Sequence, residues 1–361
     1  MVNAAEQYAA DTVSKDLEAV IRAFITDLPE RTRDIVLKRY GLDRSRKMTL
    51  EEIGKAYEIT RERVRQIESA ALKELKSSEK MEDLIPTEDI IEHIIADYGH
   101  IMEHQYLVEK SKEELPGDVH DNHVEFVLHI SDRFFDNKET DEYNKHWYIK
   151  DADLRVPEKV IQSFIEILEE KNEPVNHGLA VEHVVNHPKA EEITDEKRDS
   201  ERVKSYLLIG KRIKRNPFDE WGLAHWSEII PRGVKDKAYI ILKKEGKPLH
   251  FTEITKKINE AGFSKKEAIA QTVHNELIKD GRFVLVGRGI YALTSWGYQT
   301  GTVADVVLDV LKNADGPLTK EEIVEKVRKQ RLVKKNTIVL ALQSRDAIQK
   351  QGDGFVYVTK S

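Results

Sequence analysis

The chain of 361 residues contains no cysteine. Disulfide bonds, thiol catalysis and the common zinc ribbons are therefore excluded. No apolar run is long enough to cross a membrane, and the first residues, MVNAAEQYAA, lack the basic and apolar parts of a signal peptide. Hydrophobic residues make up 40% and charged residues 34% of the chain, as in soluble, helix-rich proteins. We expect a cytoplasmic, nucleoid-associated protein with two or more domains.

The sequence also lacks the motifs of common enzymes. There is no Gly-rich phosphate loop of the Walker type, so no cofactor is expected. Residues 100–104, HIMEH, match the H-x-x-E-H spacing of a zinc protease. A zinc site would need both histidines on one helical face, but this string falls where one predicted helix ends and the next begins, with Glu103 at the cap. We therefore predict no metal ligands and no catalytic residues.

The net charge of −7 is unevenly distributed. Residues 28–80 hold 14 Lys and Arg against 10 Asp and Glu, a balance of +4, whereas residues 81–150 hold 6 against 18, a balance of −12. Residues 226–298 hold 13 against 8, and residues 301–361 hold 11 against 8. Positive segments thus flank an acidic one, which should repel phosphates and either bind protein or space the domains.

Residues 49–75, TLEEIGKAYEITRERVRQIESAALKEL, have the pattern of a helix-turn-helix. Thr49 and Glu52 form a capping box for a first helix, residues 58–59 make the turn, and Thr60 caps a second helix. The apolar positions predict one buried face per helix. These positions are Leu50, Ile53 and Ala56 in the first helix, and Val64, Ile67, Ala71 and Leu75 in the second.

The opposite face of the second helix is polar and consists of Arg61, Glu62, Arg65, Gln66, Ser69 and Lys73. Arg pairs with guanine, Gln with adenine, and Glu accepts a hydrogen bond from cytosine. A solvated helix surface would show the same periodicity. Upstream, apolar residues predict a helix from Leu17, Pro29 opens another over 30–40, and Gly41 stops it. The helical domain ends near Ser78, and residues 77–83 are predicted to be a linker.

The string over 49–75, with LPERTRDIVLKRYGL upstream of it, resembles region 4 of primary-type bacterial sigma factors over about 17–78. The resemblance implies that this domain reads a −35 promoter element and contacts the flap of RNA polymerase. It implies that Arg61, Glu62 and Gln66 face bases. The residues expected at the DNA backbone are Arg31, Arg39, Thr49, Thr60, Arg63 and Arg65. Nothing in the printed sequence resembles region 2 of a sigma factor, so we expect no independent promoter melting.

After the linker, one unit recurs four times. Each unit has an apolar-periodic helix, a short loop with an apolar residue and a capping residue, two further helices and an aromatic stretch. The loops, at 102–103, 175–176, 249–250 and 318–319, are 73, 74 and 69 residues apart. The third helices are predicted over 122–134, 200–214, 266–280 and 336–350.

In the third unit, FVLV and IYAL flank Gly287-Arg288-Gly289, which predicts a β-hairpin. Three helices and a hairpin make a winged helix. Residues 231–298 also resemble the HARE-HTH module, which occurs in the delta subunit of bacterial RNA polymerase. Arg288 at the wing tip is a candidate for DNA backbone contact, and a solvated turn is the alternative.

We therefore predict a mainly α protein. Its parts would be a sigma region 4-like domain (1–80), an acidic winged-helix-like unit (81–150), a second such unit (151–229), a HARE-HTH domain (230–299) and a C-terminal unit (300–361). Unrelated helical spacers are the alternative for the first two units.

The predicted function is a DNA-binding bacterial transcription factor acting with RNA polymerase core at promoters. The alternative is a polymerase accessory subunit of delta type, in which DNA contact is secondary. A DNA-processing hydrolase has no catalytic constellation to support it.

Overall fold

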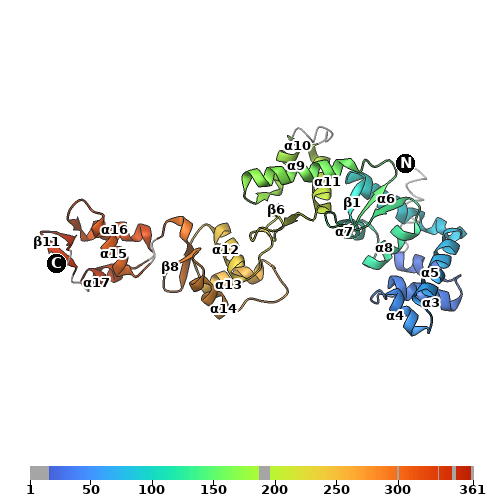
Figure 1. Cartoon of the computed structure of the whole chain (residues 1–361), viewed down its shortest axis with the longest axis horizontal. Coiled ribbons are helices and arrows are strands. Elements are labelled where there is room, and N and C mark those ends of the chain that lie inside the picture. Colours follow the sequence, from blue (N-terminus) through green and yellow to red (C-terminus); the bar gives the residue numbers. More distant parts are fainter. Residues whose placement is uncertain (1–15, 187–195, 299–300, 332, 344–346, 359–361) are drawn as a thin grey trace, which may run out of the picture. The chain divides into compact units, whose positions relative to one another are not determined.

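The computed structural model describes residues 16–186, 196–298, 301–331, 333–343 and 347–358. These residues form two compact units that divide after Lys214, and each unit is described separately. Helices predominate, and short antiparallel strands lie between them (Figure 1). The predicted class, mainly α with winged-helix units after a helix-turn-helix, is therefore confirmed. Among the described helices, none is long and apolar enough to cross a membrane.

The described chain begins with four helices: α2 (Leu17–Ile25), α3 (Glu30–Tyr40), α4 (Leu50–Ala56) and α5 (Arg61–Lys76). Local signals set these bounds, as the sequence predicted. Pro29 is the N-cap residue of α3, and Gly41 ends this helix in the left-handed region at φ 64°. Thr49 and Glu52 form the predicted capping box of α4, and the Thr60 hydroxyl accepts a hydrogen bond from the Arg63 backbone N–H.

The predicted linker over 77–83 is wrong. Residues Glu79–Leu84 form a 3₁₀ helix, η1, which leads directly into the next α-helix. The Ser78 hydroxyl caps it by accepting a hydrogen bond from the Lys80 backbone N–H, and Leu84 is fully buried. The polar composition of the segment suggested a solvated connection, but Leu84 anchors it in the core.

From α6 onward, the same order of elements occurs four times: helix, strand, helix, helix, strand, strand (Figure 1). The first repeat consists of α6 (Ile85–Asp97), β1 (Ile101–Glu103), α7 (His104–Glu114), α8 (Asp121–Ile130), β2 (Phe134–Asn137) and β3 (His146–Ile149). The second consists of α9 (Arg155–Lys171), β4 (Val175–Asn176), α10 (His177–Val185), α11 (Glu196–Ile209), β5 (Ile213–Arg215) and β6 (Glu220–Leu223).

The third repeat consists of α12 (Val234–Glu245), β7 (Leu249–His250), α13 (Phe251–Glu260), α14 (Ala270–Lys279), β8 (Phe283–Gly287) and β9 (Ile290–Leu293), and a short 3₁₀ helix, η3 (Thr294–Trp296), follows it. The fourth consists of α15 (Val303–Lys312), β10 (Leu318–Thr319), α16 (Lys320–Gln330), α17 (Lys335–Gln343), β11 (Ile348–Gln351) and β12 (Gly354–Tyr357).

The segments predicted as short loops are strands. In the first, third and fourth repeats, the last strand lies between the other two, in the orders β1-β3-β2, β7-β9-β8 and β10-β12-β11. The predicted capping residues are confirmed. At the start of each second helix, the side chain of Glu103, Asn176, His250 or Thr319 accepts a hydrogen bond from a backbone N–H.

The third helices were predicted too long at their C-terminal ends. Phe134, Lys214 and Lys350, which closed three of these predicted helices, lie instead in strands β2, β5 and β11. Apolar residues continue past the true helix ends, so periodicity alone does not reveal where the backbone changes to strand pairing. The hairpin predicted around Arg288 is confirmed, with Gly289 at φ 70°. A Cβ atom on Gly289 would come within 2.5 Å of His250 Nε2, so the position requires glycine.

One hydrophobic core joins helices α2, α3 and α5 to the first repeat. It includes Phe24 and Val36 from the helices together with Phe126, Trp147 and other residues up to Ile149 from the repeat. The core of the third repeat consists of buried residues between Ala238 and Leu293, and that of the fourth repeat of residues between Val306 and Leu342.

Candidate nucleic-acid interface

A small apolar cluster holds the helix-turn-helix together. Ile35, Ile53 and Val64 are fully buried in it, and Met48, Leu50, Tyr57, Ile59 and Ile67 pack around them. The predicted buried faces are therefore confirmed for most positions. Ala56 is an exception, because it is exposed and the residues after it, Tyr57 and Ile59, fill that side of the cluster.

The turn between α4 and α5 is tight. The Ile59 backbone N–H donates to the Gly54 carbonyl at 2.9 Å, and Glu58 has φ 53°. A Cβ atom on Gly54 would lie 2.8 Å from the Ile59 carbonyl oxygen, so only glycine allows the turn to approach α4 this closely. A groove of about 650 Å³ follows the turn, and Lys55, Arg61 and Arg63 are among its lining residues.

The capping box also fixes the start of α4 electrostatically. The Glu52 carboxylate accepts hydrogen bonds from the Thr49 backbone N–H at 2.8 Å and from Arg46 at 2.7 Å. The bond from Arg46, followed by that from the Thr49 backbone, lowers the pKa of Glu52 to about 2. The Thr49 hydroxyl accepts from the Glu52 backbone N–H, so Thr49 holds the helix end whether or not it also contacts DNA.

All six residues predicted for the polar face of α5 are exposed. Glu62 pairs with Arg65 at 2.6 Å, and this hydrogen bond lowers the pKa of Glu62. The Gln66 side-chain oxygen accepts a hydrogen bond from Arg63 at 3.2 Å. Exposed pairs of this kind contribute little to stability, so DNA could replace them at small cost. Arg61 is exposed at the first position of α5.

The residues predicted at the DNA backbone have different environments. Arg31 donates to the Tyr57 carbonyl at 3.2 Å and lies over the Tyr57 ring. Arg39 is half-buried and pairs with Glu68 at 3.2 Å, so it braces α3 against α5. Arg63 and Arg65 are exposed on α5. Arg288 is exposed between β8 and β9 and belongs to the other compact unit.

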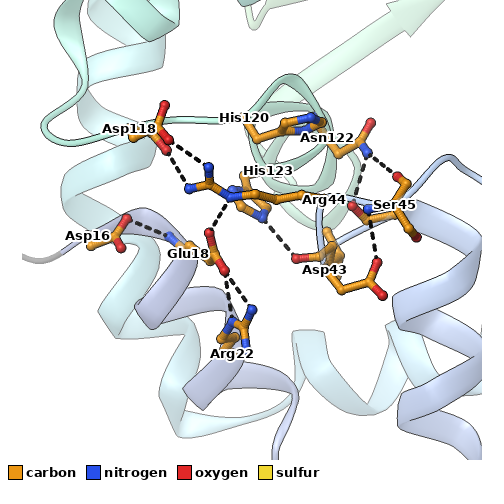
Figure 2. Close-up of polar contacts among 12 residues, drawn as sticks. Asp16, Glu18, Arg22, Asp43, Arg44, Ser45, Asp118, His120, Asn122 and His123 are labelled. Carbon is orange, nitrogen blue, oxygen red and sulfur yellow. Dashed lines mark hydrogen bonds and ion pairs between the residues drawn. The ribbon is translucent and has the colours of Figure 1, made fainter.

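Contacts from the first repeat hold the loop between α3 and α4, residues 41–49, and the sequence pattern did not indicate them. The Asn122 side chain donates to the carbonyls of Gly41, at 3.0 Å, and Ser45, at 3.3 Å (Figure 2). His123 Nε2 lies 3.0 Å from the Leu42 carbonyl oxygen. A buried polar side chain needs such a partner, but nothing in the spacing of α8 residues identifies a partner about 80 residues away.

Ion pairs extend the same contact. Arg44 reaches Glu18 at 2.8 Å and Asp118 at 2.6 Å (Figure 2), and Lys47 reaches Glu125 at 2.5 Å. These bonds raise the pKa of Arg44, with Asp118 the largest cause. Carboxylates of the acidic first repeat therefore neutralise part of the positive charge that the sequence assigned to residues 28–80.

Residues 100–104, which match the H-x-x-E-H spacing of a zinc site, have structural roles in the first repeat. The Glu103 side chain accepts a hydrogen bond from the Tyr106 backbone N–H at 2.9 Å and so caps α7. Trp147 Nε1 donates to His104 Nδ1 at 3.0 Å inside the core. Within the described residues, no group of three His, Asp or Glu side chains could hold a metal ion.

Comparison with known families identifies two domains. Residues 24–77 match sigma-70, region 4, and residues 232–296 match HARE-HTH, a family described as an ASXL and restriction endonuclease HTH domain. The chain therefore carries a sigma-70 region 4 domain and a HARE-HTH domain, as the sequence predicted. Domains of these two families are typically non-catalytic.

Similar proteins include RNA polymerase sigma factors. RNA polymerase sigma factor SigA1 of Synechococcus elongatus is 45% identical over 71 residues, or 20% of this chain and 17% of that protein. RNA polymerase sigma factor RpoD of Helicobacter pylori is 50% identical over 64 residues, 18% of this chain and 10% of that protein. RpoS of Coxiella burnetii is 46% identical over 67 residues, 19% of each. The chain thus spans less than a fifth of these relatives.

Proposed function

We propose that this chain is a DNA-binding transcription factor that reads a −35-type promoter element and acts with bacterial RNA polymerase in initiation. The supporting observation is the exposed face of α5. The capped start of this helix presents Arg61, Glu62 and Gln66 to solvent, and these residues match major-groove chemistry. Similarity to region 4 of sigma factors supports the same role. The site of action would be the nucleoid.

In this proposal, the contacts divide into two kinds. Arg61, Glu62 and Gln66 read base edges. The backbone contacts come from Arg31, Arg63 and Arg65, from the helix starts at Thr49 and Thr60, and from Arg39 where its pair with Glu68 opens. Arg288 would add a phosphate contact from the wing of the third repeat.

The five domains proposed are 1–80, 81–150, 151–229, 230–299 and 300–361. The polymerase flap is the proposed partner of the first domain.

Binding to a −35-type duplex tests direct readout. Arg61→Ala and Gln66→Ala should each cost roughly 1–3 kcal/mol on a cognate duplex and less on a scrambled duplex. Lys73→Ala is the matched control, because Lys73 is exposed on the same face nearer the C-terminal end of the helix and should change both affinities alike. If Arg61→Ala weakens both duplexes equally, base reading by α5 is wrong.

A second candidate function is an accessory subunit of RNA polymerase, in which DNA contact is secondary. Two observations favour it: the HARE-HTH domain at residues 232–296 and the acidic first repeat with 18 Asp and Glu against 6 Lys and Arg. This candidate is favoured over the first if the Arg61→Ala variant binds polymerase as tightly as the wild-type chain and neither protein prefers a −35 duplex to a scrambled duplex.

A further inference from the structure

The third helices of the repeats differ in how much of their surface is buried. Most residues of α8 are buried, and Asn122 at its start donates to the loop before α4. α11 packs on the first repeat, where the Tyr206 hydroxyl donates to the Gly99 carbonyl at 2.9 Å. In α14 of the third repeat, the buried residues are Val273 and Leu277. The first two repeats thus use their third helix for packing, whereas α14 keeps one face in solvent.

The solvent face of α14 has the chemistry that suits A·T base pairs. The side chains exposed on it are Gln271, Thr272, Asn275, Ile278 and Lys279. Gln and Asn form paired hydrogen bonds with N6 and N7 of adenine in the major groove, and apolar side chains contact the methyl group of thymine. Gln271 donates to Asn275 at 3.1 Å, and Ile278, one turn further along, is 63% exposed. The single acid of α14, Glu276, pairs with Lys279 at 3.8 Å and so is partly neutralised.

A basic groove borders one edge of this face. The groove has a volume of about 470 Å³ and opens at the start of α14, where Ile269 and Thr272 are part of its lining. Three basic residues and one acid, Glu267, also line it. The basic residues are Arg232, Lys237 and Lys266. Since residues 226–298 hold 13 Lys and Arg against 8 Asp and Glu, an anionic partner is favoured here.

The hairpin of β8 and β9 borders the opposite edge. At its tip, the Gly289 carbonyl accepts a hydrogen bond from the Phe251 backbone N–H at 2.9 Å. The Phe251 ring stacks on His274 of α14, with ring centroids 4.5 Å apart, and so joins the tip to the helix. His274 and Thr272 are two residues apart and therefore lie on opposite edges of the helix. With Arg288 exposed at the tip, α14 is flanked by basic groups on both sides, as a helix that enters the major groove between two phosphate backbones would be.

We propose that α14 is a second base-reading helix of this chain, which enters the major groove of duplex DNA and reads A·T base pairs. Gln271 and Asn275 bind adenine, and Ile278 packs on the methyl group of a neighbouring thymine. The basic groove and the hairpin tip contact the phosphates on either side. The assignment goes beyond the proposed function, because reading by α14 requires neither a −35 element nor contact between α5 and DNA.

Modified duplexes test this assignment with the full-length chain. The probes are two duplexes of equal length, one of mixed A·T sequence and one of mixed G·C sequence, both without a −35 element. The A·T duplex should bind more tightly by roughly tenfold or more. Replacing adenine with 7-deazaadenine removes the N7 acceptor but keeps the base pair, and it should abolish most of this preference. Replacing thymine with uracil removes the methyl group and should weaken binding by roughly threefold.

Variants of the two amides test the same contacts from the protein side. Gln271→Ala and Asn275→Ala should each weaken binding to the A·T duplex by about fivefold and leave binding to the G·C duplex unchanged. Gln162→Ala is the matched control. Gln162 is also an exposed helical glutamine and donates to Glu166, four residues on, at 3.2 Å, but it lies in α9 of the second repeat. Equal effects of Gln271→Ala and Gln162→Ala on the A·T duplex would contradict the assignment.

Two further outcomes separate this assignment from its alternatives. An A·T preference that survives 7-deazaadenine would indicate minor-groove reading and would overturn the assignment. A chain that carries both Arg61→Ala and Gln66→Ala should retain the preference for the A·T duplex, because these residues lie in α5. If the wild-type chain binds the A·T and G·C duplexes equally but still reads a −35 element through Arg61, the assignment fails and the proposed function stands. If Gln271→Ala removes the A·T preference while Arg61→Ala has no effect on a −35 duplex, base reading by α5 fails and the assignment stands.

Discussion

The region 4 domain and the HARE-HTH domain both pack helices around an apolar core, but they are stabilised differently. The buried core residues of the HARE-HTH domain all lie within the domain, from Ala238 to Leu293, and Phe218 outside it packs at the edge against Phe263. The region 4 domain shares its core with the first repeat, where Phe126 packs against Phe24 and Tyr40 at ring distances of 6.3 and 5.2 Å. The rigidity of the region 4 domain therefore depends partly on residues outside its family boundary.

The two domains also differ in whether the residue that holds a loop comes from the domain itself or from a neighbouring repeat. In the third repeat, Asn259 bonds both the N–H and the carbonyl of Ala268, nine residues away. In the region 4 domain, the loop before α4 is held by Asn122 from the first repeat. Since this loop leads into the helix-turn-helix, the first repeat helps to position its two helices.

The largest expected effect is that of Phe126→Ala. Phe126 is fully buried, and truncation of such a side chain costs about 3–5 kcal/mol. Hydrogen exchange should become faster in α3 and α5, and affinity for a −35 duplex should fall. Phe164→Ala is the matched control, because Phe164 is also fully buried but lies in α9 of the second repeat. Unchanged protection in α3 and α5 would contradict the shared core.

A smaller effect is expected from the two asparagines. Asn122→Ala removes hydrogen bonds to the Gly41 and Ser45 carbonyls, although Gly41 keeps the bond from the Arg44 backbone N–H, and such a loss costs about 0.5–1.5 kcal/mol. Exchange of amides in the loop before α4 should become faster, with some loss of −35 affinity. Asn259→Ala should instead affect only the third repeat. If the two variants have the same effect on −35 affinity, the first repeat does not position the helix-turn-helix.

The difference between these domains also explains which features the sequence could predict. The bounds of α3 and the caps of α4 and α5 depend on neighbouring residues, such as Pro29, Gly41 and Thr49, and they were predicted correctly. The four repeats were predicted because helix caps recur at a regular spacing. The exposed polar face of α5 was predicted for the same local reason.

The contacts across domains had no local signal. Asn122 and His123 look like ordinary polar residues at the start of a helix, and Leu84 directly follows the polar segment 77–83 that was predicted to be a linker. The first strand of each repeat was missed because strands of two or three residues have no resolvable periodicity, and their pairing partners lie far along the chain. Roles in DNA binding for Arg61, Glu62, Gln66 and the backbone residues stay predictions.

The smallest expected effect concerns pH and Glu125. This residue of α8 pairs with Lys47 in the loop before α4 and so links the first repeat to the region 4 domain. Burial alone would raise the pKa of this carboxyl, but hydrogen bonds from His104 and Lys47 outweigh it and lower the pKa to about 2. The stabilisation is therefore present above the ordinary value of 4.5 and is lost as the pH falls from there toward 2. Because Lys47 retains access to water, we expect Glu125→Gln to cost only about 1 kcal/mol at neutral pH.

Acid unfolding followed by hydrogen exchange in α3 and α5 measures this effect. Glu125→Gln should flatten the pH dependence of protection in those helices between about pH 4.5 and 2, since the glutamine does not titrate. Glu322→Gln is the control: Glu322 also has a lowered pKa, caused by bonds to Thr319, but it caps a helix of the fourth repeat. It should flatten the acid response of α16 alone. A steep acid loss of protection in α3 and α5 that Glu125→Gln leaves unchanged would show that other carboxylates, such as Glu18 or Asp118 around Arg44, control the acid response of this contact.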